Sequence, residues 1–480
     1  MSTETLFAKL KWKFLLPIAA VGLVIVAQLY YLPDRVIFFK QLLDFAQIES
    51  EQSLSHLAYD SADYQALFWV TQVTPPDTTL LLLTATPNTY GDSSYVLYHR
   101  ALYHLYPRTV WWAAPVPPTR YPNWWITTDL SEPDTLSIVD THHIDAVWAD
   151  GFTTPPLNGE FVSFDRDTHL VFPNGSPSNI STPNSYFHSV KSSSWWLTTK
   201  TMSWLDVVLL IVKTAGATVS IFLWGDILYC LLVNTWLSAA SPSRPAIAWI
   251  LGCGITSLVT FILLWAGLLL NVAIAGLSVV GVGLWLFLWK DWALALVAGR
   301  DFPALSTLNT WSLLFSVILL AQIARIIFAT LVSPLTDWDA WVNWASKANI
   351  LFIDQTISAN LYNNPARLPT NMDYPLMLPL VEAWFYSWLG HIYEPVTNLI
   401  SLFFYLALLL LFYGVVSQFT SPTSALGFTT LLATIPRIER LAHSGFADIP
   451  VAALVLLSAL SFSYLYTALS PKFSLDPKSL

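Results

Sequence analysis

The sequence predicts a multi-span α-helical membrane protein of about eight spans with an inserted α/β domain on the extracytoplasmic side. Two features of the composition support this fold class. The chain is 55% hydrophobic and 11% charged, whereas soluble domains carry about 25% charged residues, and its mean hydropathy is +0.53. A third observation is the order of segments, because residues 35–200 are polar, proline-rich and free of spans, whereas apolar runs dominate the rest.

The first predicted element is a retained membrane anchor. Lys9, Lys11 and Lys13 precede an apolar run at 14–31 that ends at an interfacial Tyr30-Tyr31-Leu32-Pro33. Basic residues before a span favour a cytoplasmic N-terminus, and no small-x-small cleavage site follows the run. We therefore expect 1–32 to form a cytoplasmic tail and an anchor.

The span-free region 33–203 has the pattern of an extracytoplasmic α/β domain. Strands are predicted at 79–84, 108–112, 123–127 and 145–148, and helices at 93–106 and 134–143. Strands that alternate with helices predict a mostly parallel sheet. No glycine-rich phosphate loop follows the first strand, so the sequence assigns this domain no chemistry.

Seven apolar runs follow this region, and each approaches or exceeds the ~20 residues that span a bilayer. They lie at 205–236, 246–269, 271–289, 310–333, 396–417, 424–442 and 449–468. The first is too long for one straight span and is expected to be either a tilted helix or a helix with an interfacial segment. We divide these runs between transmembrane helices 2–4 in 204–309 and a module in 310–480 with an outer loop at 334–395.

Charged residues predict the orientation in the membrane. Counting from a cytoplasmic N-terminus, the basic residues fall in cytoplasmic segments, as the positive-inside rule requires: Arg244, Lys290, Arg300, Lys472 and Lys478. The loop 334–395 then lies on the extracytoplasmic side with the α/β domain. We expect a multi-pass protein of the plasma (inner) membrane with both termini cytoplasmic.

The net charge and the cysteines exclude some function classes. A net charge of −9 argues against nucleic acid as a partner. Cys230 and Cys253 both lie in apolar segments and are expected to be small membrane-embedded residues rather than a disulfide or a metal site.

The most informative motif is Asp337-Trp-Asp-Ala-Trp-Val-Asn-Trp344, which directly follows an apolar run. Ionisable groups near hydrocarbon are costly unless they are paired, solvated or functional, so this acidic pair is a candidate active site. Solvated residues at a helix end are the alternative. The tryptophans and Lys347 predict an amphipathic segment against the headgroups, and the aromatic rings would serve as a membrane belt or a sugar platform. An interfacial helix is expected at 341–352, and a juxtamembrane helix at the outer surface at 382–388.

Further charged residues flank the later spans. Asp373 and Tyr374 precede a proline, and Asp373 could instead start a turn or cap a helix. Arg437, Glu439, Arg440 and His443 come before Asp448 at an outer helix end. The arginines there and Arg325 either bind a phosphate, which suits guanidinium forks, or pair within the bundle.

This order of elements resembles the GT-C class of membrane glycosyltransferases, which includes the dolichyl-phosphate-mannose and aminoarabinose transferases. The resemblance covers residues 310–468 and rests on three short motifs. They are Trp338-Asp-Ala-Trp341 with Lys347, Asp373-Tyr-Pro-Leu-Met-Leu-Pro379, and Gly445-Phe-Ala-Asp-Ile-Pro450. The chain departs from the class because four spans and an outer domain come first and only three spans follow the loop.

The resemblance implies transfer of a sugar from a polyprenyl-phosphate carrier, in contact with membrane lipid, to an unidentified acceptor on the outer face. Glycosyl transfer needs a carboxylate that accepts the acceptor's proton, and Asp339 is the expected base with Asp337 beside it. Alternatively, Asp337 and Asp339 hold a divalent cation such as Mg²⁺ or Mn²⁺. Substrate-binding roles fall to the second acid and the flanking residues: Asp448, Lys347, Asp373, Tyr374, Arg437 and Arg440.

Two other functions are compatible with the sequence. One is a transporter or flippase for lipid-linked glycans, which predicts acids and arginines within the spans and paired half-helices. The other is a non-catalytic assembly protein whose α/β domain recruits a partner.

Overall fold

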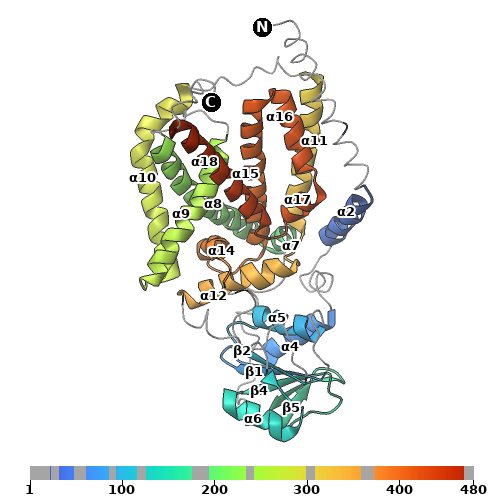
Figure 1. Ribbon diagram of the computed structural model, residues 1–480. Coiled ribbons are helices and arrows are strands. Elements are labelled where there is room, and N and C mark those ends of the chain that lie inside the picture. The colour runs from blue at the N-terminus through green and yellow to red at the C-terminus, as the bar shows by residue number, and fades with distance from the viewer. Residues whose placement is uncertain are drawn as a thin grey trace.

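The computed structural model describes residues 22, 32–47, 61–85, 93–115, 126–175, 194–233, 243–298, 309–357, 371 and 373–469. A helical bundle forms one part, and a six-stranded sheet lies beyond one end of it (Figure 1). The anchor predicted at 14–31 lies outside the described residues except for Gly22.

The described residues contain five helices that are long and apolar enough to cross a membrane. They belong to α8 (Trp204–Val233), α9 (Arg244–Trp265), α10 (Leu270–Ala298), α11 (Thr310–Val332) and α15 (Pro395–Phe419). A shorter apolar stretch lies in α18 (Asp448–Leu469). Their apolar composition is that of a membrane-embedded helical protein.

The long run predicted at 205–236 forms one unbroken helix, α8, of 30 residues. Its charged residues beyond the first turn, Lys213 and Asp226, both have hydrogen-bond partners. Lys213 donates to the carbonyl of Leu389 at 3.0 Å, and Asp226 accepts from Arg244 at 2.9 Å and from the indole of Trp285 at 3.2 Å. Asp226 is buried and is thus neutralised by Arg244, as a buried ionisable group requires, whereas Lys213 is exposed.

The apolar run at 424–442, predicted as one helical span, does not form a single unbroken helix. The region forms two short helices, α16 (Pro422–Ala433) and α17 (Pro436–Leu441). Pro436 has no backbone N–H and disfavours the helical conformation of the residue before it. Ile435 is accordingly extended, with φ −68° and ψ 118°, and the helix breaks there.

The sheet has the strand order β3-β2-β1-β4-β6-β5. Its members are β1 (Thr79–Thr84), β2 (Thr109–Ala114), β3 (Ile126–Thr127), β4 (Ala146–Asp150), β5 (Glu160–Ser163) and β6 (Thr168–Phe172). The first four pair in parallel, at positions close to those predicted. The sequence did not predict β5 and β6, which add an antiparallel edge.

Helices cover both faces of the sheet. Side chains of α4 (Ser61–Val73) and α5 (Ser93–His104) pack on one face together with Leu80 and Trp112. α6 (Glu132–His142) packs on the other face, where it contacts residues such as Leu81 and Val147. Successive side chains of a strand point to opposite faces, so each apolar strand contributes to two cores.

Two further helices, α2 (Leu32–Gln47) and α7 (Trp195–Thr201), pack against the bundle. α2 packs on α11 through Leu42, Ala329 and Val332. α7 precedes α8, and the indole of Trp195 donates to the carbonyl of Pro395 at 2.9 Å.

The segment after α11 lies between the bundle and the α/β domain. It begins with a π-helical turn, η3 (Ala340–Ala345), and continues as α12 (Ser346–Asp354). Figure 1 shows α12 crossing beneath the upright helices, with α5 between it and the sheet. Trp341 and Trp344 are only 2% and 8% exposed and belong to the main core. The predicted amphipathic helix against the headgroups is therefore wrong, because protein rather than lipid covers these rings.

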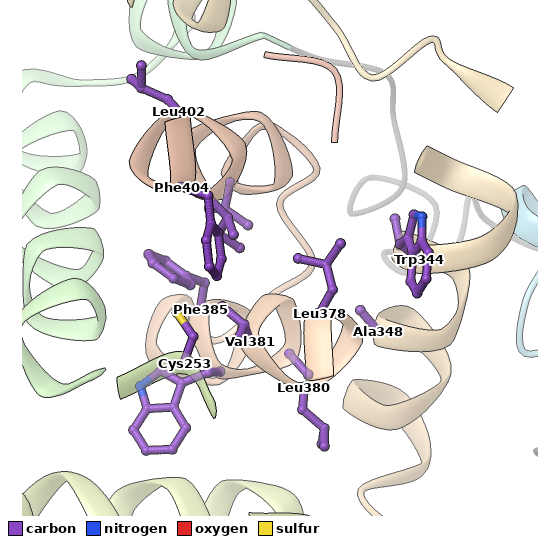
Figure 2. Close-up of a cluster of buried hydrophobic side chains, with 14 of the residues drawn as sticks. Cys253, Trp344, Ala348, Leu378, Leu380, Val381, Phe385, Leu402 and Phe404 are labelled. Carbon is purple, nitrogen blue, oxygen red and sulfur yellow. The ribbon is translucent and has the colours of Figure 1, made fainter. Parts of the chain in front are cut away.

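The juxtamembrane helix predicted at 382–388 is longer than expected and does not lie at the surface. It forms α14 (Met377–Leu389), which is buried along most of its length. Figure 2 shows Val381 and Phe385 of this helix within the core, with Phe404 of α15 beside them. Its apolar residues occupy all sides rather than one stripe, and such a helix is enclosed by other helices.

Candidate functional site

The acidic pair lies where α11 ends and η3 begins. The backbone is extended at Ser333, and the chain then turns so that the N–H of Ala340 donates to the carbonyl of Asp337 at 3.1 Å. Asp337 forms an ion pair with Arg440 of α17, with 2.5 Å between Nη2 and Oδ1. Arg440 lies in α17, the short helix that follows the break at Ile435, so the segment whose break was not predicted contributes directly to the site.

Asp339 is the less constrained of the two acids. Its side chain is exposed and accepts a hydrogen bond from the amide of Asn343 at 3.1 Å. Partial burial and the negative charges of Asp448 and Asp337 raise its pKa above the ordinary value. The carboxylates of Asp337, Asp339 and Asp448 are therefore close enough to interact.

Asp448 begins α18 and shares its surroundings with Arg437. The guanidinium of Arg437 lies 3.9 Å from the carboxylate, and the side chains are 80% and 47% exposed. Arg437 and Arg440 thus extend from α17 toward the three acids without being buried. They remain accessible for an anionic ligand.

Two amide side chains connect the acidic pair with a buried lysine. Asn343 accepts from the amide of Asn371 at 3.0 Å, and the carbonyl of Asn371 accepts from Lys347 Nζ at 2.6 Å. Asn371 adopts a positive φ of 58°, a conformation that asparagine tolerates better than most residues. The chain of contacts therefore runs from Asp339 through both asparagines to Lys347.

Lys347 is almost fully buried, and this affects its charge. Burial lowers the pKa of its ammonium group to about 8, and the negative charge of Asp373 opposes the shift. Its Nζ lies 6.0 Å and 5.6 Å from the ring centroids of Trp344 and Tyr374, and these two rings stack at 5.4 Å. Aromatic faces attract a cation at such distances, so Lys347 is held next to Asp373 and Tyr374.

The structure separates Arg325 from the acids. Arg325 forms an ion pair with Glu439, which also lies 3.6 Å from Arg35 and accepts from Gln322 at 2.9 Å. Of the two roles that the sequence left open for Arg325, internal pairing is the one observed. Glu439 is thus paired with Arg325 and Arg35, whereas Arg437 and Arg440 reach the acids.

The contact between α5 of the α/β domain and the candidate site was not predicted from the sequence. Trp338, between the two acids, stacks on Tyr95 of α5 at 5.7 Å and contacts the ring of His99 at 5.3 Å. Farther along α5, the ring of Tyr103 lies 5.6 Å from Trp341, and its hydroxyl donates to Glu394 at 2.8 Å. The spacing of Tyr95, His99 and Tyr103 along one helix face is the signal that could have predicted this contact.

No group of three or more histidine, cysteine, aspartate or glutamate side chains that could hold a metal ion occurs in the described part of the chain. The divalent cation suggested for Asp337 and Asp339 would have two acidic ligands, one of which is already paired with Arg440. The two cysteines are buried free thiols.

No protein family model matches this chain, and comparisons with curated proteins and with solved structures give no match either.

Proposed function

We propose that this protein is an integral membrane glycosyltransferase that transfers a sugar from a polyprenyl-phosphate carrier to an acceptor on the outer face of the plasma membrane. The observation that supports it best is the arrangement around Asp339. A carboxylate with a raised pKa lies beside two further acids, two exposed arginines and a network that ends at Lys347.

The proposed reaction assigns each residue a role. The acceptor hydroxyl attacks the anomeric carbon, the bond from that carbon to the phosphate oxygen breaks, and the carrier phosphate keeps the electron pair. Asp339 accepts the hydroxyl proton, and its raised pKa makes it a stronger base. Arg437, Arg440 and Lys347 offset the charge of the leaving phosphate, while Asp448 orients the acceptor.

The proposed topology follows the predicted one, with about eight spans and the sheet and segment 334–395 on the extracytoplasmic side. Contacts of α5 with Trp338 and Trp341 support placing both parts at the same end of the bundle. In this arrangement the α/β domain supports the segment that carries the acids.

A transfer assay tests the proposal. Purified full-length protein would receive a panel of radiolabelled polyprenyl-phosphate sugars together with lipid extracts as acceptors. The expected result is label transfer by the wild type and a ~10²–10⁴-fold loss in Asp339→Asn. Asp206→Asn, at an exposed position at the start of α8, serves as the matched control. Equal transfer by Asp339→Asn would exclude the assigned base.

Transport of a lipid-linked glycan is the second candidate function. The broken helix at Ile435 and the charged residues inside the bundle, such as Asp226, Glu382 and Glu439, are features expected of transporters. Proteoliposomes that move a fluorescent polyprenyl-phosphate sugar across the bilayer without forming a product would favour transport over transfer.

A further inference from the structure

Glu382 is an acid in the interior of the bundle. It lies on α14 with 0% of its surface exposed, between Val381 and Ala383 of the main core. Within the described part of the chain, neither carboxyl oxygen has a hydrogen-bond partner. An ionised carboxylate in such surroundings is strongly unfavourable unless an opposite charge or a ligand neutralises it.

A second buried glutamate shows how this protein neutralises such a charge. Glu439 is 5% exposed, and it is paired with Arg325 and Arg35 and accepts from Gln322. No described ion pair of this kind reaches Glu382. The two glutamates are equally deep in protein, but only one has a counter-charge.

The groups nearest to Glu382 cannot neutralise it. Tyr386 lies one turn farther on the same face of α14, close to the charges of Glu382 and Glu394 and to the hydroxyl of Thr397. Glu394 accepts from Tyr103 and would add to the negative charge. Cationic and acidic groups on adjacent elements are engaged elsewhere: Lys213 with Leu389, Lys347 with Asn371, and Asp354 with Tyr106.

We propose that Glu382 is a proton-binding site, neutral in the resting protein, whose proton exchanges with solvent. The surroundings of this site adjoin the candidate site, because the methyl group of Thr397 and the side chain of Ala340, the residue after Asp339, both lie beside Gly445. The ligand of this site is the proton, and the proposal does not depend on the transfer reaction.

Infrared spectroscopy of the purified full-length protein tests the protonation state directly. The wild type at neutral pH should show a carbonyl band of a protonated carboxyl group, and Glu382→Gln should lack it. If the Glu382→Gln variant does not fold, Glu382→Met provides a second test, because its apolar side chain suits the buried position. Glu160→Gln, at an exposed acid of β5, should leave the band unchanged.

Exchange is measured in the same spectra. Transfer to heavy water should shift the band of the wild type, because deuterium replaces the exchangeable proton. A wild-type band that both Glu382 variants retain would overturn the proposal, because Glu382 would then be ionised. A band that sodium chloride abolishes in the wild type would also overturn it, since a metal cation would be the ligand. A band that does not shift in heavy water would refute exchange.

Discussion

The contact between α5 and the candidate site can be weakened by removing one oxygen atom. Tyr103 is 2% exposed and Glu394 is 1% exposed, and the tyrosine hydroxyl donates to the carboxylate at 2.8 Å. Tyr103→Phe deletes this donor but keeps the ring that lies 5.6 Å from Trp341. The carboxylate of Glu394 then stays buried with one hydrogen bond fewer.

The size of the effect follows from the type of bond. A hydrogen bond to a charged group contributes ~1.5–3 kcal/mol, and a buried acceptor that loses its donor costs a similar amount. Since 1.4 kcal/mol corresponds to a factor of ten in an equilibrium constant, the opening equilibrium of this contact should increase by about 10- to 100-fold. Glu394→Gln in the same background should add little, because the charge that the hydroxyl stabilised is gone.

Hydrogen exchange of individual segments measures this opening. We expect the amides of α5 and η3 to exchange faster in Tyr103→Phe by that factor, and those of the distant helix α10 to be unchanged. Tyr466→Phe, at a side chain that is 63% exposed on α18, is the matched control. Exchange in α5 and η3 equal to that of the wild type would refute the view that this bond holds the sheet to the site.

Three further predictions concern charge. Asp448→Asn removes a negative charge and should lower the raised pKa of Asp339. Because a base acts only when ionised, the acidic limb of the pH–rate profile should move to lower pH. An acidic limb at the wild-type pH would contradict the assignment of Asp339 as the base. Lys347 has a pKa of about 8, so its ammonium group loses its charge as the pH rises through this value. The KM for the carrier should therefore increase near pH 8 in the wild type and stay constant in Lys347→Met. The same pH dependence of KM in both proteins would exclude a role of Lys347 in binding. Glu439→Gln removes the carboxylate that pairs with the partly buried Arg325 and Arg35. It should lower the free energy of unfolding in detergent by ~3–5 kcal/mol, and a loss below ~1 kcal/mol would contradict the structural role of this cluster.

The local pattern of apolar and polar residues was enough to predict most of the long helices and three of the parallel strands. Apolar length alone located α8, α9, α10, α11 and α15 within a few residues. The alternation of strands and helices between 79 and 150 likewise predicted β1, β2 and β4. Each of these elements has a strong signal of its own, either a span-length apolar run or a short apolar strand between polar turns.

Elements whose position depends on distant residues were not predictable in this way. α14 is aromatic, has one acid and is too short to span, which matches a juxtamembrane helix at the surface, yet it packs against α8, α9, α12 and α15. The tryptophans of η3 match an interfacial belt equally well, and only their contacts with α5 and the core place them inside the protein. Composition cannot distinguish a ring that faces lipid from one that faces another helix.

The candidate site was predicted only in part, because some of its contacts also depend on residues that are distant in the sequence. Asp337, Asp339, Arg440 and Asp448 were named as candidates, and the structure brings them together. The connection from Asn343 through Asn371 to Lys347 was missed, because asparagines carry no charge pattern and the two lie 28 residues apart. The break before Pro436 was also missed, although the residue before a proline is a frequent helix boundary.

The sidedness of the acidic pair tests the account most directly, because transfer from a lipid carrier on the outer face requires Asp337 and Asp339 to lie there. Thr336→Cys places a thiol at an exposed position beside the pair, and Gln418→Cys places one at the opposite end of α15. Both natural cysteines are buried, so background labelling is low. In intact cells, a membrane-impermeant maleimide should label Thr336→Cys and not Gln418→Cys. Labelling of Gln418→Cys alone would place the acids in the cytoplasm and contradict the proposed function.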